Sequence, residues 1–235
     1  MDADSGRLRY AGFLMVLIAV AFILAARLIY LYMASPQRFP INTVKIAASY
    51  QHISHQQLES LLSNYLSSSF FTLSVRRLYT DLAALDWANK VQIERIWPDT
   101  LKITLIEKIP TATWNKSMIT EKGEIFNENG ELTESALPHL NGPDNQQKEV
   151  LQVYKKLSKI LANYGLYASA LEWRDNHAWE LKLANGLQLH LGKRDLDMRI
   201  TRFCKAYPAV FAERAEQLAS VDLRYPRGMA VQWKK

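Results

Sequence analysis

The chain has 235 residues, of which 49% are hydrophobic and 22% charged, a composition that excludes a disordered or fibrous protein and allows one or two globular domains. The formal net charge is +6, but the lysines and arginines are scattered among 23 acidic residues, so no basic block indicates a nucleic-acid ligand. The only cysteine, Cys204, cannot form an intramolecular disulfide, and an exported domain would therefore depend on its hydrophobic core.

The first element in chain order is an apolar segment near the N-terminus. Residues 10–26 carry no charge, and apart from Arg27 the apolar character continues to Met33. A helix over 10–33 would reach roughly 36 Å, enough to cross a hydrocarbon layer of about 30 Å. The alternative is a cleaved signal peptide, but its apolar core would be unusually long and no clear small-x-small cleavage site follows. The sequence therefore predicts a transmembrane helix over 10–33.

Two basic residues, Arg7 and Arg9, stand immediately before this segment. Because basic residues beside the first membrane helix are retained in the cytoplasm, residues 1–9 are predicted to be a cytoplasmic tail. Residues 34–38 then form a short linker, and the rest of the chain lies outside the cytoplasm.

The next segment alternates between strand and helix patterns. A strand is expected around 44–46, two amphipathic helices begin at the capping residues Ser54 and Ser74, and two strands cover 91–97 and 101–107. Pro98-Asp99 supplies the turn between the last two strands. The order strand, helix, helix, strand, strand predicts two helices packed on a small sheet.

This order after one membrane span resembles a POTRA domain. The stretch over 95–114, RIWPDTLKITLIEKIPTATW, is similar to the end of the POTRA domain in the FtsQ/DivIB family of cell-division proteins. The similarity is carried by Arg95, Trp97-Pro98-Asp99, Leu101-Lys102-Ile103, Leu105, Glu107, Pro110 and Trp114. It implies an α+β fold with a single transmembrane helix, a POTRA domain (β-α-α-β-β) over 39–109 and a second, β-rich domain with two helices over 110–235.

The remaining residues read mostly as strands, with turn signals at Lys122-Gly123, Asn129-Gly130 and Asn185-Gly186. One helix is expected over 146–165, ending at Gly165. A second begins near Asp195, and Pro208 should kink or split it near Tyr207. Its apolar stripe is predicted from Leu196, Ile200, Phe203, Tyr207 and Val210.

No set of residues carries a recognisable reaction chemistry. The five histidines are scattered, the nine glycines form no phosphate-binding loop, and no serine stands in a nucleophile elbow. Cys204 lies beside an apolar stripe, which favours a buried, inert thiol over a reactive one. The sequence predicts no catalytic residues, no cofactor, no metal and no small-molecule substrate, and the protein is not expected to be an enzyme.

The last residues carry the most readable functional pattern. Strands are expected over 220–225 and 229–233, and a strand at the end of a sheet offers unpaired N–H and C=O groups to another strand. Tyr225 and Trp233 either complete the core or form part of an interface, and the pattern leaves both open. The basic residues around them suit an acidic partner: Arg224, Arg227, Lys234 and Lys235.

The family resemblance implies a non-catalytic scaffold of the division machinery, in the inner membrane at the division septum. Such a scaffold links early and late division proteins by binding FtsB-like and FtsL-like proteins through the last strand, among other divisome membrane proteins. The partner-binding residues that carry over are Arg224, Tyr225, Gly228, Trp233 and Lys193. Two departures from the family pattern are Pro226-Arg227 in the turn and Lys193 in place of an arginine, which loses the bidentate fork.

Two other functions are weighed against this scaffold. A POTRA-bearing accessory protein of an export or outer-membrane assembly system would carry tandem POTRA repeats or a membrane barrel, and a periplasmic hydrolase would need a nucleophile constellation. The sequence shows neither feature.

Overall fold

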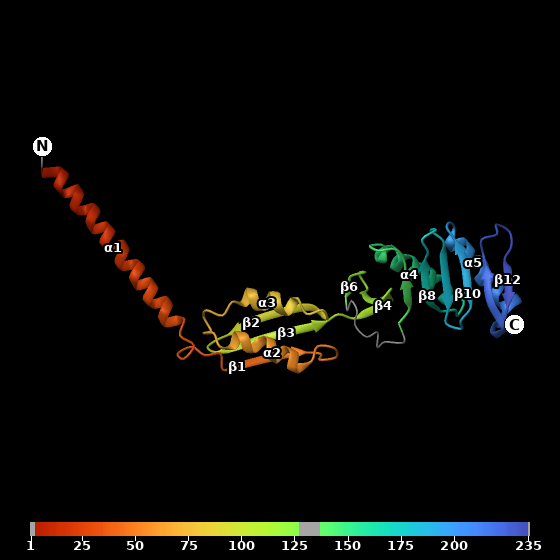
Figure 1. The fold of residues 1–235 in the computed structure, drawn as a ribbon, viewed down its shortest axis with the longest axis horizontal. Coiled ribbons are helices and arrows are strands. Elements are labelled where there is room, and N and C mark those ends of the chain that lie inside the picture. Colours follow the sequence, from red (N-terminus) through yellow and green to blue (C-terminus); the bar gives the residue numbers. More distant parts are fainter. Residues whose placement is uncertain (1–2, 127–136, 235) are drawn as a thin grey trace. The chain divides into compact units, whose positions relative to one another are not determined.

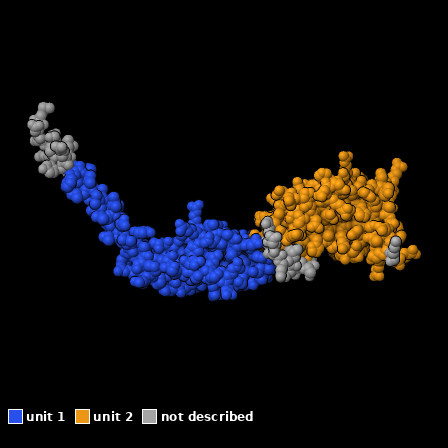
Figure 2. All heavy atoms as spheres, viewed as in Figure 1, with its two compact units in different colours: residues 1–107 blue, residues 108–235 orange. Residues whose placement is uncertain are grey.

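The structure is a computed structural model that describes residues 3–126 and 137–234, with side chains from residue 12 onward. The chain divides into two compact units, Met1–Glu107 and Lys108–Lys235 (Figure 2). The predicted α+β fold class is confirmed: one apolar N-terminal helix precedes a small helix-and-sheet domain and a β-rich domain with helices (Figure 1). The turn predicted at Asn129-Gly130 lies outside the described residues.

Helix α1 (Ala3–Met33) contains an apolar stretch long enough to cross a membrane, Gly12–Met33. None of its most apolar window is buried inside the protein. A helix satisfies its backbone hydrogen bonds internally, so this exposed apolar surface is suited to lipid rather than water.

The first unit contains a three-stranded sheet with the strand order β1-β3-β2 (Figure 1). Strand β1 is parallel to β3, and β2 is antiparallel to β3. Two helices follow β1 in the chain and share one hydrophobic core with the sheet. The bounds are β1 (Thr43–Ala48), α2 (His55–Leu66), α3 (Val75–Ala83), β2 (Ala88–Ile96) and β3 (Thr100–Glu107).

The two predicted helix caps are confirmed. The Ser54 hydroxyl accepts a hydrogen bond from the Gln57 N–H at 3.1 Å, and the Ser74 hydroxyl accepts one from the Arg77 N–H at 3.4 Å. Each bond satisfies a backbone donor that the first turn leaves unpaired. Both helices therefore begin where the local sequence predicts.

Glu107, one of the residues that carry the family similarity, has a structural role. Its side chain is buried and accepts hydrogen bonds from the N–H groups of Gln51 at 3.1 Å and His52 at 3.0 Å. A buried carboxylate needs such partners. Glu107 thus ties the segment before α2 to the end of β3.

The second unit is built on a nine-stranded sheet with the order β12-β11-β10-β9-β8-β7-β4-β5-β6 (Figure 1). The first strands are β4 (Pro110–Trp114), β5 (Ser117–Thr120), β6 (Ile125–Phe126) and β7 (His139–Asn141). They are followed by β8 (Ala168–Trp173), β9 (Trp179–Leu183), β10 (Gln188–Gly192), β11 (Leu218–Asp222) and β12 (Ala230–Trp233). Strand β7 was not predicted, because only its central residue, Leu140, is buried and three residues give no periodic signal.

Helices α4 (Gln147–Ala162) and α5 (Leu196–Ala206) contact each other and cover one face of this sheet. Apolar side chains from both helices and from the inward positions of β8 to β11 form one core, including Leu157, Phe203 and Leu181. The core leaves the edge strand β12 only partly covered.

The prediction that Pro208 interrupts the second helix is confirmed. Helix α5 ends at Ala206, and the chain continues as a π-helical turn (Tyr207–Phe211) and a 3-10 segment (Ala212–Gln217). The predicted stripe is wrong at its last position, since Val210 is exposed and Phe211 is buried. A π turn inserts one extra residue, which shifts the inward position from 210 to 211.

Cys204 is fully buried in the second core. Burial away from water raises the pKa of its thiol to about 11, because the thiolate would lose its hydration. The side chain therefore behaves as a small apolar group at neutral pH, which supports the expectation of an inert thiol.

Candidate partner-binding site

Strand β12 forms one edge of the nine-stranded sheet and pairs on one side with β11. The register places Val231 opposite Val221 and Ala230 opposite Asp222. The other side of β12 has no strand partner among the described residues. Such an edge presents backbone donors and acceptors to solvent.

The direction of the backbone groups along β12 follows from one hydrogen bond at the end of the strand. The Lys234 N–H donates to the Gln217 carbonyl at 2.7 Å, so the backbone of residue 234 faces β11. Backbone groups alternate in direction along an antiparallel strand. The N–H and C=O groups of Val231 and Trp233 therefore point to the open edge, and those of Gln232 point inward.

The loop that joins β11 to β12 is held by hydrogen bonds from Arg202 of α5. The guanidinium donates to the carbonyl of Pro226 at 2.7 Å and to those of Leu223 at 3.0 Å and Tyr225 at 2.8 Å. Three carbonyls on one planar guanidinium restrict the loop backbone. This contact positions the residues that the sequence predicts as partner-binding.

Tyr225 and Trp233 both remain on the surface. Their side chains are 54% and 44% exposed, respectively. Tyr225 lines a shallow hollow together with loop residues that include Gly228 and Met229. Trp233 lies at the other end of β12, opposite the buried Leu218. The two rings thus occupy opposite ends of the same edge.

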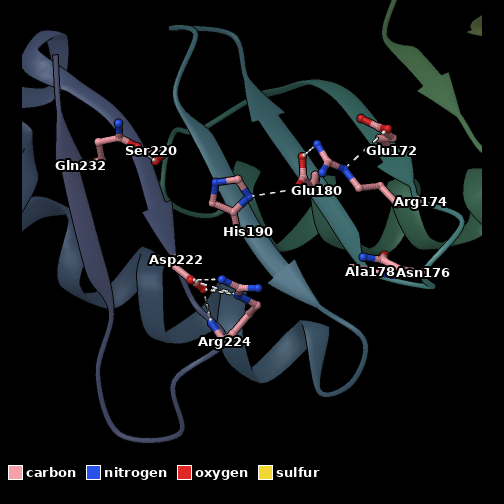
Figure 3. A network of polar contacts seen from close by, with 10 residues as sticks. All are labelled: Glu172, Arg174, Asn176, Ala178, Glu180, His190, Ser220, Asp222, Arg224 and Gln232. Atoms are coloured by element: carbon pink, nitrogen blue, oxygen red, sulfur yellow. Dashed lines mark hydrogen bonds and ion pairs between the residues drawn. The ribbon is translucent and has the colours of Figure 1, made fainter. Parts of the chain in front are cut away.

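Arg224 is paired with a neighbouring carboxylate. Its Nε donates to Asp222 Oδ1 at 2.9 Å and its second guanidinium nitrogen to Oδ2 at 2.6 Å (Figure 3). These hydrogen bonds hold the pKa of Asp222 below its usual value and raise that of Arg224. The guanidinium is nevertheless mostly exposed, so it can also contact a partner.

Gly192 brings the end of β10 close to Arg224. It has a φ of +74°, and a Cβ added there would lie 3.1 Å from Arg224 Cγ and 2.6 Å from the Arg199 guanidinium. The absence of a side chain therefore allows the close approach. Lys193 follows directly and is exposed. The structure thus brings the end of β10, just before Lys193, close to Arg224, and leaves Trp233 at the far end of β12.

A row of polar residues crosses the face of the sheet opposite the helices and ends on β11, the strand next to the edge strand β12 (Figure 3). Register pairs connect Glu172 to Glu180, Glu180 to His190 and His190 to Asp222. His190 Nδ1 lies 3.0 Å from Glu180, whose other oxygen accepts from Arg174 at 2.6 Å. These side chains flank Arg224 and fix the polar character of its surroundings.

Sequence reasoning missed this row and Arg202. A sequence pattern could have indicated the row, because each of its residues stands between two apolar residues, as His190 does between Leu189 and Leu191. This alternation places the polar side chains on the face of the sheet away from the core. The order of the strands in the sheet, which brings these residues side by side, could not be predicted from the sequence. Among the described residues, no group of three or more His, Cys, Asp or Glu side chains is arranged to hold a metal ion.

Two family models match the chain. One, described as "POTRA domain, FtsQ-type", matches residues 39–108. The other, "Cell division protein FtsQ/DivIB, C-terminal", matches residues 112–224 and so ends just before Tyr225 and β12.

Individual proteins are similar over most of the chain. A protein from Coxiella burnetii named "Cell division protein FtsQ" is 34% identical, over 93% of this chain and 90% of its own length. Proteins of the same name from Shewanella oneidensis and Escherichia coli are 32% and 31% identical, over 94% and 96% of this chain and 84% of their own lengths.

Proposed function

The chain belongs to the FtsQ/DivIB family of cell division proteins, and from this premise we propose that it is a non-catalytic scaffold of the divisome. In this proposal the protein is anchored in the inner membrane at the septum and links early and late division proteins. It binds an FtsB-like and FtsL-like subcomplex by accepting a partner strand at β12. The similarity to division proteins over most of the chain favours this function over an export or assembly accessory.

The observation that carries the proposal is the open edge of β12 with an aromatic ring at each end. A strand that adds to this edge would bond to the outward groups of Val231 and Trp233, and main-chain bonds of this kind give affinity. The rings of Tyr225 and Trp233 would then contact alternate side chains of the partner, which gives specificity. A four-residue strand extends about 13 Å, so one short partner segment can reach both ends.

Charge supports an acidic partner. Arg224, Arg227 and Lys234 are exposed around β12. Lys193 is a fourth exposed cation, and it directly follows Gly192, which approaches the Arg224 side chain. Lys235, which the sequence also places in this rim, lies outside the described residues. Complementary charge raises the association rate and disfavours wrong partners. Asp222 already accepts hydrogen bonds from the Arg224 guanidinium. A partner carboxylate would therefore share this guanidinium with Asp222 or displace Asp222 from it.

The charge contribution gives a first expected result. Lys193→Glu should weaken binding of the full-length chain to the FtsB/FtsL-like subcomplex of the same bacterium, mainly by slowing association, and the loss should shrink at high ionic strength. Lys159→Glu on α4 is the matched control, since it makes the same charge change on an exposed position of the helical face. Equal losses for both variants would point to net charge alone and would remove Lys193 from the interface.

The proposed topology gives a second expected result. An enzyme that is active only outside the cytoplasm, fused after Lys235, should be active in cells because Arg7 and Arg9 retain the N-terminus inside. The same enzyme fused before Met1 should be inactive. A stable but inactive fusion after Lys235 would contradict the orientation and, with it, the access of β12 to partners outside the cytoplasm.

A further inference from the structure

A cluster of aromatic rings connects the end of α1 to the tip of the β2–β3 hairpin. Phe39 follows α1 and packs edge-to-face on Tyr32, with the ring centroids 5.8 Å apart. Phe71, from the loop between α2 and α3, lies 4.9 Å from Phe39, and Trp97 of the hairpin tip lies 5.1 Å from Phe71. We call Phe39, Phe71 and Trp97, together with Arg38, the aromatic base of the first unit.

The aromatic base is tied to the last turn of α1 by hydrogen bonds. The buried hydroxyl of Ser69 donates to the carbonyl of Met33 at 2.6 Å, and the Phe70 N–H donates to the carbonyl of Phe39 at 2.8 Å. On the hairpin side, the Asn42 N–H donates to the carbonyl of Asp99 at 3.1 Å. These bonds hold the loop before α3 and the hairpin tip at the end of the apolar helix (Figure 1).

Trp97 is the most exposed ring of the aromatic base, with 68% of its surface exposed. Its exposure is unusual for a ring that size, because a large apolar surface is normally buried. Tryptophan is enriched at the membrane–water boundary, where the indole ring is partly apolar and its N–H can reach polar groups. A position beside the end of a membrane-crossing helix provides that boundary.

The polar residues of the aromatic base suit lipid headgroups. The guanidinium of Arg38 lies 4.4 Å from the centre of the Tyr32 ring, an arrangement that leaves its N–H groups able to contact phosphate. Asp99 is the carboxylate nearest in sequence to Trp97, and its oxygens accept from Asn42 at 2.8 Å and Thr100 at 3.1 Å. These hydrogen bonds engage both Asp99 oxygens within the hairpin turn and with the segment before β1.

We propose that the aromatic base lies in the headgroup layer of the bilayer that α1 crosses and docks the first unit on that surface. The occupant is lipid because the cluster is continuous with Tyr32 and Met33 of the apolar helix. The proposal rests on the proposed membrane crossing, and it goes beyond the binding of division proteins because it assigns a separate surface, remote in sequence from β12, to lipid.

Tryptophan fluorescence in liposomes tests this contact. The full-length chain would be reconstituted into liposomes that contain anionic lipid and lipids brominated on the acyl chains near the headgroup, since bromine quenches only rings near it. Residues 1–33 contain no tryptophan, so α1 contributes no signal. We expect quenching of the unaltered chain and loss of most of that quenching in Trp97→Tyr.

Trp87→Phe is the matched control. Trp87 stands just before β2, and Trp97 just after it, so nine strand residues separate them by roughly 30 Å. Trp87 also stacks on His52, with centroids 3.5 Å apart, at the end of the unit away from the aromatic base. This variant should retain the bromine-dependent quenching. Equal quenching in Trp97→Tyr and the unaltered chain would overturn the proposal.

Arg38→Glu provides a second variant that keeps Trp97 as the reporter. We expect it to reduce the quenching in liposomes with anionic lipid, because a carboxylate would replace the cation that faces the phosphates. Extraction with alkaline carbonate separates the two proposals. A chain that is extracted would contradict the membrane crossing and the docking together, whereas a chain that stays in the bilayer with an unquenched Trp97 would contradict the docking alone.

Discussion

Val231→Pro is expected to weaken binding of the FtsB/FtsL-like subcomplex by about 5- to 150-fold while the second unit stays folded. Proline removes the N–H that Val231 directs to the open edge, and a partner carbonyl buried against it would lose its donor, which costs about 1–3 kcal/mol. The pairing with β11 loses no hydrogen bond, because that N–H points away from β11. Proline is tolerated on edge strands for this reason.

Gln232→Pro is the informative comparison, because it places the same ring one residue further along β12. The Gln232 N–H points toward β11, and its side chain accepts from the Ser220 hydroxyl at 3.1 Å. This variant should lower the melting temperature of the second unit, whereas Val231→Pro should leave it nearly unchanged. Calorimetric affinity and thermal unfolding of the full-length chain, measured for both variants, separate binding from stability. Undiminished binding by Val231→Pro would show that no strand adds to β12.

Truncating the two aromatic rings should have the other large effect. Tyr225→Ala and Trp233→Ala are each expected to weaken partner binding by about thirtyfold, which corresponds to ~2 kcal/mol for an aromatic anchor at an interface. Because the rings lie at opposite ends of β12, their effects should add in the double variant, to roughly a thousandfold.

Tyr167→Ala is the control for the loss of an exposed aromatic ring. Tyr167 is 67% exposed and precedes β8, away from the β12 edge. It should leave the affinity unchanged. If Tyr225→Ala instead lowered the unfolding free energy by several kcal/mol and left the affinity of the folded fraction intact, Tyr225 would belong to the core and the interface would lie elsewhere.

Most elements of both units were predictable because their signals are local. A cap such as Ser54 bonds to a backbone N–H three residues away, and the apolar repeat of α2 arises within two or three turns. Pro208 likewise acts on its own helix. The burial of Phe211 in place of Val210 at the last position of the apolar stripe was not predictable, because it depends on the π turn rather than on a regular helical period.

The candidate site was only partly predictable. Tyr225, Gly228 and Trp233 came from a terminal pattern together with a family resemblance, and the structure adds their exposure and their separation along β12. Arg202 gave no local signal, although it holds three carbonyls of the loop, because its partners lie 21 to 24 residues further along the chain. The need for a glycine at position 192 was likewise not predictable, because it depends on the side chains of Arg199 and Arg224 that approach this residue.

The amino-acid sequence by itself determined the long apolar N-terminal helix, most of the later helices and strands, the caps of α2 and α3 and the kind of fold, because apolar periodicity and backbone capping act between residues a few positions apart. Only the tertiary structure decided that Arg202 holds the loop before β12, that Gly192 approaches Arg224, and that Phe39, Phe71 and Trp97 meet at the end of α1. Each of these contacts joins segments far apart in the chain, and its existence depends on strand order and register, which no local pattern specifies.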